Sequence, residues 1–157
     1  MNKRGAVLAG RIQAELREFT ILVERIELGM EKAKTQSDDF YLDSVALNLH
    51  GFYSGVERLF KKIAGTIDGT MPEGANWHQE LLTQMSIEVP GVRPAVISLE
   101  LKEKLEEYRG FRHVVRNVYT YHLDPEKVKP LVKPIIRVRK KLEKELSAFA
   151  RFIQGAQ

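Results

Sequence analysis

The chain has 157 residues, of which 43% are hydrophobic and 29% are charged. This length and composition favour one folded domain over residues 1–157 and argue against a disordered chain. There is no cysteine, which excludes disulfide bonds, thiolate metal sites and a cysteine nucleophile, and which favours a cytoplasmic location. No apolar run approaches membrane-spanning length, so we expect no membrane association. The net charge of +4 permits a nucleic-acid partner without demonstrating one.

Apolar residues recur every three or four positions along almost the whole chain, which predicts an all-α protein. The first such stripe covers residues 8–33. The second covers residues 42–67 and follows capping residues at 37–39, and Gly65 and Gly69 are expected to end this helix.

A shorter helix is predicted next, because Asn76 and Gln79 have the spacing of a capping box. Its expected buried face consists of Trp77, Leu81, Leu82 and Met85. Two prolines then interrupt regular structure over residues 89–94. Ser98 is the expected cap of the following helix, whose apolar stripe covers residues 101–118.

The last helix has a strong start signal at residues 124–126, where the sequence reads Asp-Pro-Glu. Pro130 and Pro134 lie inside it, so we expect a kink or a broken first turn. Four long helices and one short helix with short connections predict an antiparallel up-and-down helical bundle.

One segment combines several residues suited to chemistry. Arg109, Arg112, His113 and Arg116 lie at positions i, i+3, i+4 and i+7, which places them on one helical face. Such cations repel one another by roughly a few tenths of a kcal/mol per pair, and an anion such as RNA phosphate would relieve this repulsion. The alternative is a solvated face paired with acids on neighbouring helices, which is the stronger interpretation on these residues alone.

A sequence motif changes that balance. Arg116 and Asn117, followed after four residues by His122, resemble the Arg-x(4–6)-His signature of HEPN domains, which are α-helical bundles. As is typical of that family, a polar residue follows the arginine, and the motif ends a late helix just before a capped final one. The segments 47–58 and 77–82 are similar to those of HepT-like ribonucleases, and the resemblance extends over nearly the whole chain.

The resemblance implies a metal-independent endoribonuclease toxin that needs no cofactor. Its implied partners are an RNA substrate, an MNT-type nucleotidyltransferase antitoxin and a second copy of the chain. Histidine has a near-neutral pKa that suits proton transfer, so His122 receives that role. The forked guanidinium of Arg116 suits the charge on a pentacovalent phosphate, and Asn117 orients the backbone or the phosphate. The expected RNA-binding residues are Arg109, Arg112 and His113.

The spacing of the motif poses a geometric problem. Six residues along an ideal helix correspond to about 120° around its axis, so Arg116 and His122 would not share a face. Either the helix ends around Tyr121, or a second subunit completes the site. HEPN ribonucleases resemble the second case, with two motifs meeting at a dimer interface, and we expect both effects.

The sequence departs from the family at one position. In HepT proteins a tyrosine that the antitoxin modifies with AMP commonly stands two positions after the histidine, where this chain has Asp124. We interpret Asp124 as a helix cap. Tyr119 and Tyr121 lie nearby, but no motif match transfers the role to either, so modification with AMP stays open.

Other candidate residues carry weaker signals. His50, Tyr53 and Glu57 share one side of the second helix, where a polar network is favoured over a metal site because a metal needs more ligands. Trp77 beside His78 has the ring to stack on a base, although packing is the commoner role of a lone tryptophan.

The last helix also carries cations at helical spacing: Lys133, Arg137, Lys140, Lys141 and Lys144. They have the spacing to follow a phosphate backbone. Glu143 and Glu145 interleave with them, which favours an ordinary solvated face.

Two other functions remain open. The first is a non-catalytic accessory or substrate-binding subunit of a nucleotidyltransferase, which the absent tyrosine favours. The second is a structural bundle in which Arg116 and His122 are surface residues without a joint role. Convergence of these two residues on one cleft is the feature that separates the ribonuclease from both.

Overall fold

In the computed structural model, which describes residues 3–117, 119 and 123–155, the regular elements are helices, as the sequence predicts. Only one isolated β-bridge, between Val89 and Arg93, interrupts this pattern in the described residues. The elements are α1 (Lys3–Thr35), α2 (Phe40–Ile63), the π-helix η1 (Ala64–Asp68), α3 (Trp77–Met85), α4 (Leu99–Asn117), α5 (Pro125–Val132) and α6 (Ile135–Ile153).

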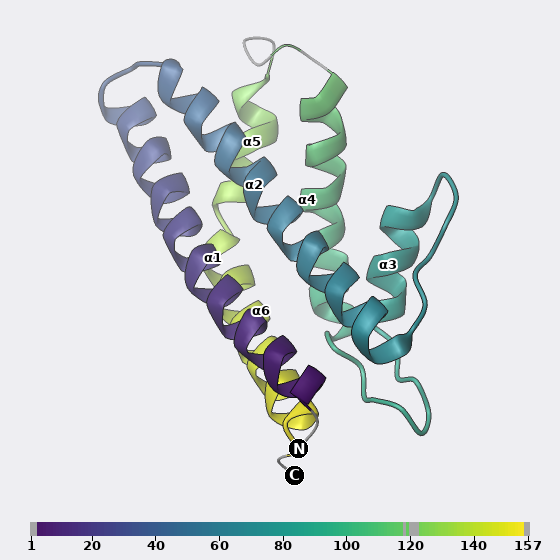
Figure 1. Ribbon diagram of the computed structural model, residues 1–157. Helices are drawn as coiled ribbons and strands as arrows, with labels where there is room; N and C mark the ends of the chain where they lie inside the picture. Colours follow the sequence, from purple (N-terminus) through teal and green to yellow (C-terminus); the bar gives the residue numbers. More distant parts are fainter. Residues whose placement is uncertain (1–2, 118, 120–122, 156–157) are drawn as a thin grey trace.

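The long helices alternate in direction, as Figure 1 shows: α1 and α4 run upward in that view, whereas α2 and the α5–α6 pair run downward. α1 packs against α2 and α6, and α2 packs against α4. The short α3 lies against α2 and α4 at one side of the molecule. None of the described helices is long and apolar enough to cross a membrane.

Aromatic rings join the helices at the centre of the core. Phe52 of α2 makes edge-to-face contacts with Phe19 of α1 and Tyr108 of α4, at centroid distances of 5.6 and 5.7 Å. Such pairs contribute about 0.5–1.5 kcal/mol each beyond the burial of their area. Gly55 allows α1 to approach, because a Cβ there would meet the Phe19 ring at 2.9 Å. The Tyr108 hydroxyl donates a hydrogen bond to the Leu131 carbonyl at 2.6 Å and ties α4 to α5.

Two predicted helix caps are confirmed and one capping box is wrong. The Ser98 hydroxyl accepts a hydrogen bond from the Leu101 amide at 3.1 Å, and the Asp124 carboxylate accepts one from the Glu126 amide at 2.9 Å. Asn76 does precede α3, but its side chain makes no capping hydrogen bond. Its backbone, at φ −102° and ψ 22°, lies outside the extended region from which a capping side chain reaches the first turn.

The predicted long final helix is instead two helices, α5 and α6. The break follows about two turns of helix and not the first turn, and it falls at Lys133 and Pro134. Pro134 has no amide hydrogen to donate, and its ring clashes with the carbonyl four residues earlier. Pro130 is accommodated inside α5. The described helices therefore include two short ones, α3 and α5, where one was expected.

The end of α2 widens into the π-helix before Gly69 terminates it. The Gly69 amide donates to the Ala64 carbonyl at 2.9 Å, five residues back, and Gly69 takes a left-handed conformation with φ 72°. Gly69 thus ends the helix as predicted, whereas Gly65 lies inside η1 and does not end it. The widened turn was not predicted, because the apolar spacing does not register a single extra residue in a turn.

The loop between α3 and α4 is held by a buried arginine. The Arg93 guanidinium donates to both Asp68 carboxylate oxygens, at 2.6 and 2.8 Å, and also to the carbonyls of Gln84, Ile87 and Pro94. Burial alone would raise the pKa of Asp68, but hydrogen bonds from Arg93 and the Gln84 amide outweigh it and hold the pKa below its ordinary value. These contacts fix the loop against η1 and so position the start of α4.

Candidate functional site

The carboxyl-terminal half of α4 lines a cavity of about 370 Å³, which we call the α4 cavity. Its lining residues are His78, Arg109, Arg112, His113, Arg116 and Asn117. No acidic residue lines it, and three of its six residues are arginines. The structure thus brings together every described residue that the sequence analysis assigned to the site, and adds His78 from α3.

Arg112 does not lie free in this cavity. Its side chain is only 9% exposed, and Nη1 donates to Oε1 of Glu57 at 2.7 Å. The other carboxylate oxygen of Glu57 lies 2.7 Å from Nδ1 of His78, which in turn lies 3.1 Å from Nη2 of Arg112. One ring nitrogen cannot donate to the carboxylate and accept from the guanidinium at once. The shorter contact, to an ionised acceptor, favours Nδ1–H donating to Glu57.

The Glu57 carboxylate lies in the interior, where it needs a cation. The glutamate is 5% exposed on the inner side of α2, and an unpaired charge there would cost several kcal/mol. Glu57 does belong to a polar network, but its hydrogen-bonding partners in the described residues are His78 of α3 and Arg112 of α4. They are not His50 and Tyr53, with which the sequence pattern grouped it. This pairing was not predicted from the sequence, because Arg112 was assigned to RNA and His78 was given no role of its own. An acid inside an apolar stripe was the available signal.

Tyr53, one turn before Glu57, completes the inner wall of this network. The Arg112 guanidinium carbon lies 5.8 Å from the centroid of the Tyr53 ring. Burial raises the pKa of the Tyr53 hydroxyl, and the carboxylates of Glu57 and Glu106 raise it further. Tyr53 is therefore a neutral aromatic platform for Arg112.

The remaining cations of the α4 cavity differ in their availability. Nε of Arg109 donates to Oε2 of Glu106 on the same helix at 2.8 Å. Arg116 and His113 are exposed, and within the described residues neither forms an ion pair. Of the three arginines that line the cavity, Arg116 is therefore the one whose guanidinium forms no ion pair with a described acid.

Asn117 is engaged with its own helix. Its Nδ2 donates to the His113 carbonyl at 2.7 Å, one turn back along α4. This contact fits a role in orienting the backbone. The Asn117 side chain is an uncharged amide whose oxygen can only accept hydrogen bonds, so Asn117 adds no positive charge to the cavity.

His122 lies outside the described residues, as does Tyr121, so convergence of Arg116 and His122 is not described. The structure does remove the geometric objection to the motif. α4 ends at Asn117, before the expected Tyr121, and Tyr119 is exposed and non-helical. Because the non-helical Tyr119 lies between Arg116 and His122 in the sequence, the angle of about 120° that one continuous helix would impose does not apply.

His50 lies on α2 close to the same group of arginines. Burial lowers its pKa from 6.5, and the positive charges of Arg112 and then Arg116 lower it further. The half-buried ring is thus held in its neutral form, as a proton acceptor beside two guanidinium groups. The sequence pattern predicted a polar network that includes His50, but it did not predict that positive charges would surround it.

The depressed pKa of His50 predicts a loss of stability in mild acid. The unfolded chain takes up a proton at this residue near pH 6.5, whereas the folded chain does so only at lower pH. The His50 contribution is therefore present above pH 6.5 and is lost as the pH falls toward the folded pKa. Thermal unfolding between about pH 7.5 and pH 5.5 should show a smaller decline in Tm for His50→Gln than for the wild type. His113→Gln is the control, and an equal change in both variants would contradict the assignment.

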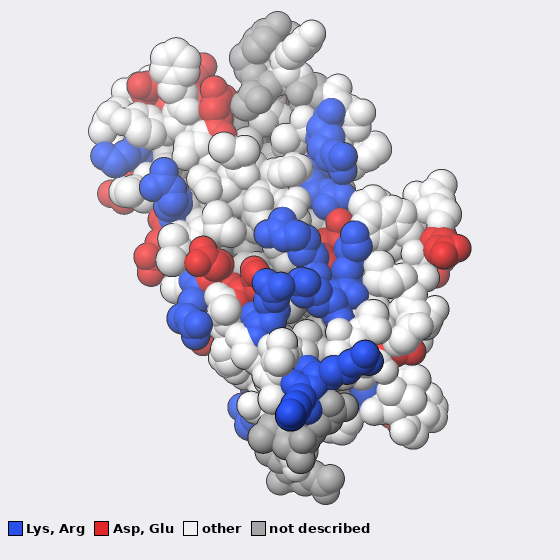
Figure 2. All heavy atoms as spheres, viewed as in Figure 1, with Lys and Arg blue, Asp and Glu red and all other residues white. Residues whose placement is uncertain are grey.

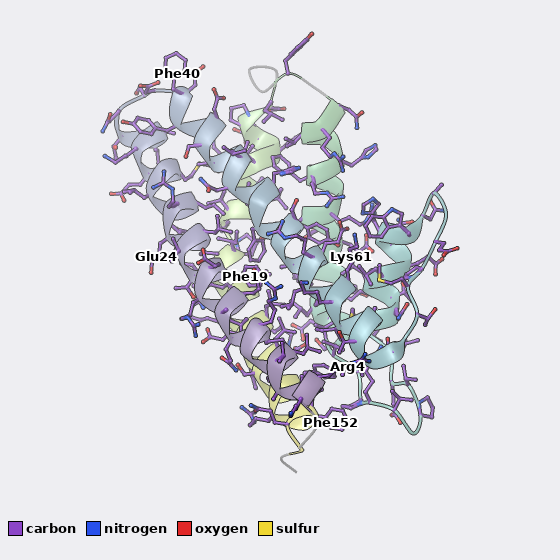
Figure 3. The ribbon with its side chains drawn as sticks, in the orientation of Figure 1. Arg4, Phe19, Glu24, Phe40, Lys61 and Phe152 are labelled. Carbon is purple, nitrogen blue, oxygen red and sulfur yellow. The ribbon has the colours of Figure 1, made fainter. Side chains whose placement is uncertain are left out.

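Trp77 and His78 form a stacked pair at the edge of the α4 cavity. Their rings lie 3.7 Å apart between centroids, and the Lys61 ammonium lies 5.0 Å from the Trp77 ring centroid. Figure 3 shows Lys61 on the part of α2 that faces α3. Trp77 is half-buried and packs against the core. The Trp77 ring thus already has His78 and Lys61 as neighbours, which supports the packing interpretation over stacking on a base.

The cations of α6 include ordinary surface ion pairs. Lys141 lies 3.2 Å from Glu145 and 3.4 Å from Glu100, as expected of a solvated face. In the described part of the chain, no three histidine or acidic side chains are grouped so that they could hold a metal ion.

A family model described as "HepT-like protein" matches residues 44–153, which include every residue lining the α4 cavity. No curated protein and no solved structure matches the chain significantly.

Proposed function

The chain belongs to the HepT-like protein family, and on this premise we propose that it is a metal-independent endoribonuclease toxin of a HepT–MNT type pair. The observation that carries the proposal is the α4 cavity. Its lining has no acid, and Arg116 of the sequence motif lies there without a described ion pair. A lining of this kind favours an anion, and a phosphodiester is the anion on which a HEPN-type site acts.

The proposed reaction is attack of a ribose 2′-oxygen on the adjacent phosphorus. The bond from phosphorus to the 5′-oxygen breaks, leaving a 2′,3′-cyclic phosphate and a 5′-hydroxyl. His122 transfers the protons, and Arg116 stabilises the charge that develops on the phosphoryl oxygens. Asn117 holds the backbone at the end of α4.

RNA binding is assigned to the other members of the cavity. Arg109 and His113 present exposed or half-exposed groups to phosphates. Arg112 contributes its charge from within the protein while it remains bound to Glu57.

A homodimer would place two Arg116–His122 segments in one groove. Leu47 of α2 and Val114 of α4 support this arrangement, because they are apolar yet 70% and 38% exposed on neighbouring helices. The dimer would bury these side chains. Residues 1–157 would then form one HEPN-like bundle per subunit, which an MNT-type nucleotidyltransferase would bind.

The alternative is an accessory or substrate-binding subunit of a nucleotidyltransferase. One observation favours it: Asp124, which stands where HepT proteins commonly have the modified tyrosine, is occupied in capping α5. A chain that cannot accept AMP at that position would be regulated differently or would not be a toxin.

Cleavage of RNA in the presence of a chelator tests the proposal. The purified chain should cut RNA at an unchanged rate in excess EDTA and leave 2′,3′-cyclic phosphate ends, because the proposed proton transfer and charge stabilisation use side chains alone. The ends can be identified by mass spectrometry. Activity that disappears in EDTA and returns with a divalent ion would contradict the mechanism. Absence of cleavage, together with stimulation of a nucleotidyltransferase, would establish the alternative.

A further inference from the structure

A second basic cavity lies where the start of α1 meets the end of α2. It encloses about 570 Å³, and its lining residues are Lys3, Arg4, Val7, Leu8, Arg11, Lys62, Gly65 and Thr66. We call it the N-terminal cavity. No residue of the α4 cavity lines it, and none of its residues was assigned to a functional site from the sequence.

All the charged residues that line the N-terminal cavity are positively charged. Four of its eight residues are cationic and none is acidic. Arg11 and Lys62 are exposed, and neither forms an ion pair within the residues that the structure describes. The charges of Arg11 and Lys62, which no described acid pairs with, repel each other, and a bound polyanion would relieve that repulsion.

The form of this cavity favours an extended ligand over a small ion. Its cations are long, exposed side chains, and none is fixed by burial as Arg93 is. Val7, which is 73% exposed, and Leu8 add an apolar wall beside the charges. No heavy atom beyond its neighbours lies within 4 Å of a Cβ built on Gly65, which leaves the backbone of η1 open to a ligand. A sugar-phosphate strand combines charge with apolar ribose surface in this way.

Basic side chains connect the two cavities across one face of the molecule. In Figure 2, Lys and Arg residues extend from the upper part of α4, across α2, to the lower end where α1 begins. In Figure 3, Lys61 lies on α2 along this path and Arg4 lies at its lower end. A strand whose phosphate occupies the α4 cavity would therefore pass several groups of positive charge on its way to the N-terminal cavity.

We propose that the N-terminal cavity binds the backbone phosphates of a single-stranded RNA segment that flanks the phosphate held in the α4 cavity. The identity of the ligand as RNA rests on the proposed function. The cavity acts through charge and apolar contact with ribose, so it binds without sequence preference and lengthens the strand that the protein recognises.

The test uses an RNA of about sixteen nucleotides with every 2′-hydroxyl methylated, so that binding is measured without cleavage. Replacing Arg11 and Lys62 by glutamate should weaken binding by roughly tenfold or more. It should also lower the slope of log affinity against log salt by at least about 1.4, since each contacted phosphate contributes about 0.7 for single strands. The matched control is Lys140→Glu with Lys144→Glu, which makes the same charge change at exposed positions of α6 that line neither cavity. The control should retain wild-type affinity.

The outcomes separate this proposal from the proposed function. Unchanged affinity in the Arg11/Lys62 variant, or an equal loss in the α6 control, would overturn the N-terminal cavity as an RNA site even if the wild type cuts RNA. Lost binding to an acidic protein partner with unchanged RNA binding would also overturn it. Conversely, a selective loss of binding in the Arg11/Lys62 variant, with no cleavage of unmethylated RNA by the wild type, would support the cavity and contradict the ribonuclease. Circular dichroism of each variant confirms that the helices are intact.

Discussion

Replacing Arg116 by alanine is expected to reduce the rate of RNA cleavage by roughly 10²–10³-fold, the typical effect of removing one group that stabilises transition-state charge. The same change should cost little stability. Arg116 is exposed in the last turn of α4, and no ion pair links it to the described residues. Only its interaction with the helix dipole is lost, about 0.3–1 kcal/mol. Single-turnover cleavage and urea denaturation measure the two quantities.

Arg151→Ala is the matched control for this variant, because Arg151 is also an exposed arginine in the last turn of a helix. It should lose the same small stability and no activity. His122→Ala should lose roughly 10²–10⁴-fold in rate, as expected of a residue that transfers protons. Full activity in Arg116→Ala or His122→Ala would contradict the catalytic assignment and leave the accessory-subunit function in its place.

Replacing Arg112 by alanine, unlike replacing Arg116, is expected to cause a large loss of stability. Arg112 and Glu57 form a buried ion pair, and removing one partner leaves an uncompensated charge in the interior. The free energy of unfolding should fall by roughly 3–5 kcal/mol. Arg109→Ala removes an arginine from the same helix whose partner, Glu106, is on the surface, so it should cost less than about 1 kcal/mol.

A double variant identifies the cause of that loss. Arg112→Met combined with Glu57→Met removes both charges, so it should be considerably more stable than Arg112→Ala alone. Urea denaturation of Arg112→Met, Glu57→Met and the double variant gives the coupling free energy. A loss in Arg112→Ala no greater than that in Arg109→Ala would mean that the Glu57 carboxylate is not left unpaired, and would contradict the structural role of Arg112.

The sequence predicted the helices well because apolar spacing reports directly on burial. The stripes of residues 8–33 and 101–118 begin and end close to α1 and α4. Local caps such as Asp124 were also predictable, because the donor lies only two residues away. Asn76 shows the limit of such signals, since its backbone conformation depends on how the preceding loop packs.

Contacts between distant residues could not be predicted in the same way. Glu57 and Arg112 are 55 residues apart, and Asp68 and Arg93 are 25 apart, so no periodic pattern relates them. The sequence did assign Arg109, His113 and Arg116 to one face, and the structure places all three on one cavity. It missed His78, which reaches that cavity from another helix.

The π-helix makes the length of one short segment matter. Each residue added to or removed from a helix turns all that follows by about 100°. Residues 64–67 lie between Lys62, in the lining of the N-terminal cavity, and Asp68, which holds Arg93 in the interior. Deleting one of them would return the Gly69–Ala64 hydrogen bond to ordinary helical register and swing Asp68 away from Arg93. The segment is therefore a spacer of fixed length. A substitution that preserves the widened turn should be tolerated better than a deletion or an insertion.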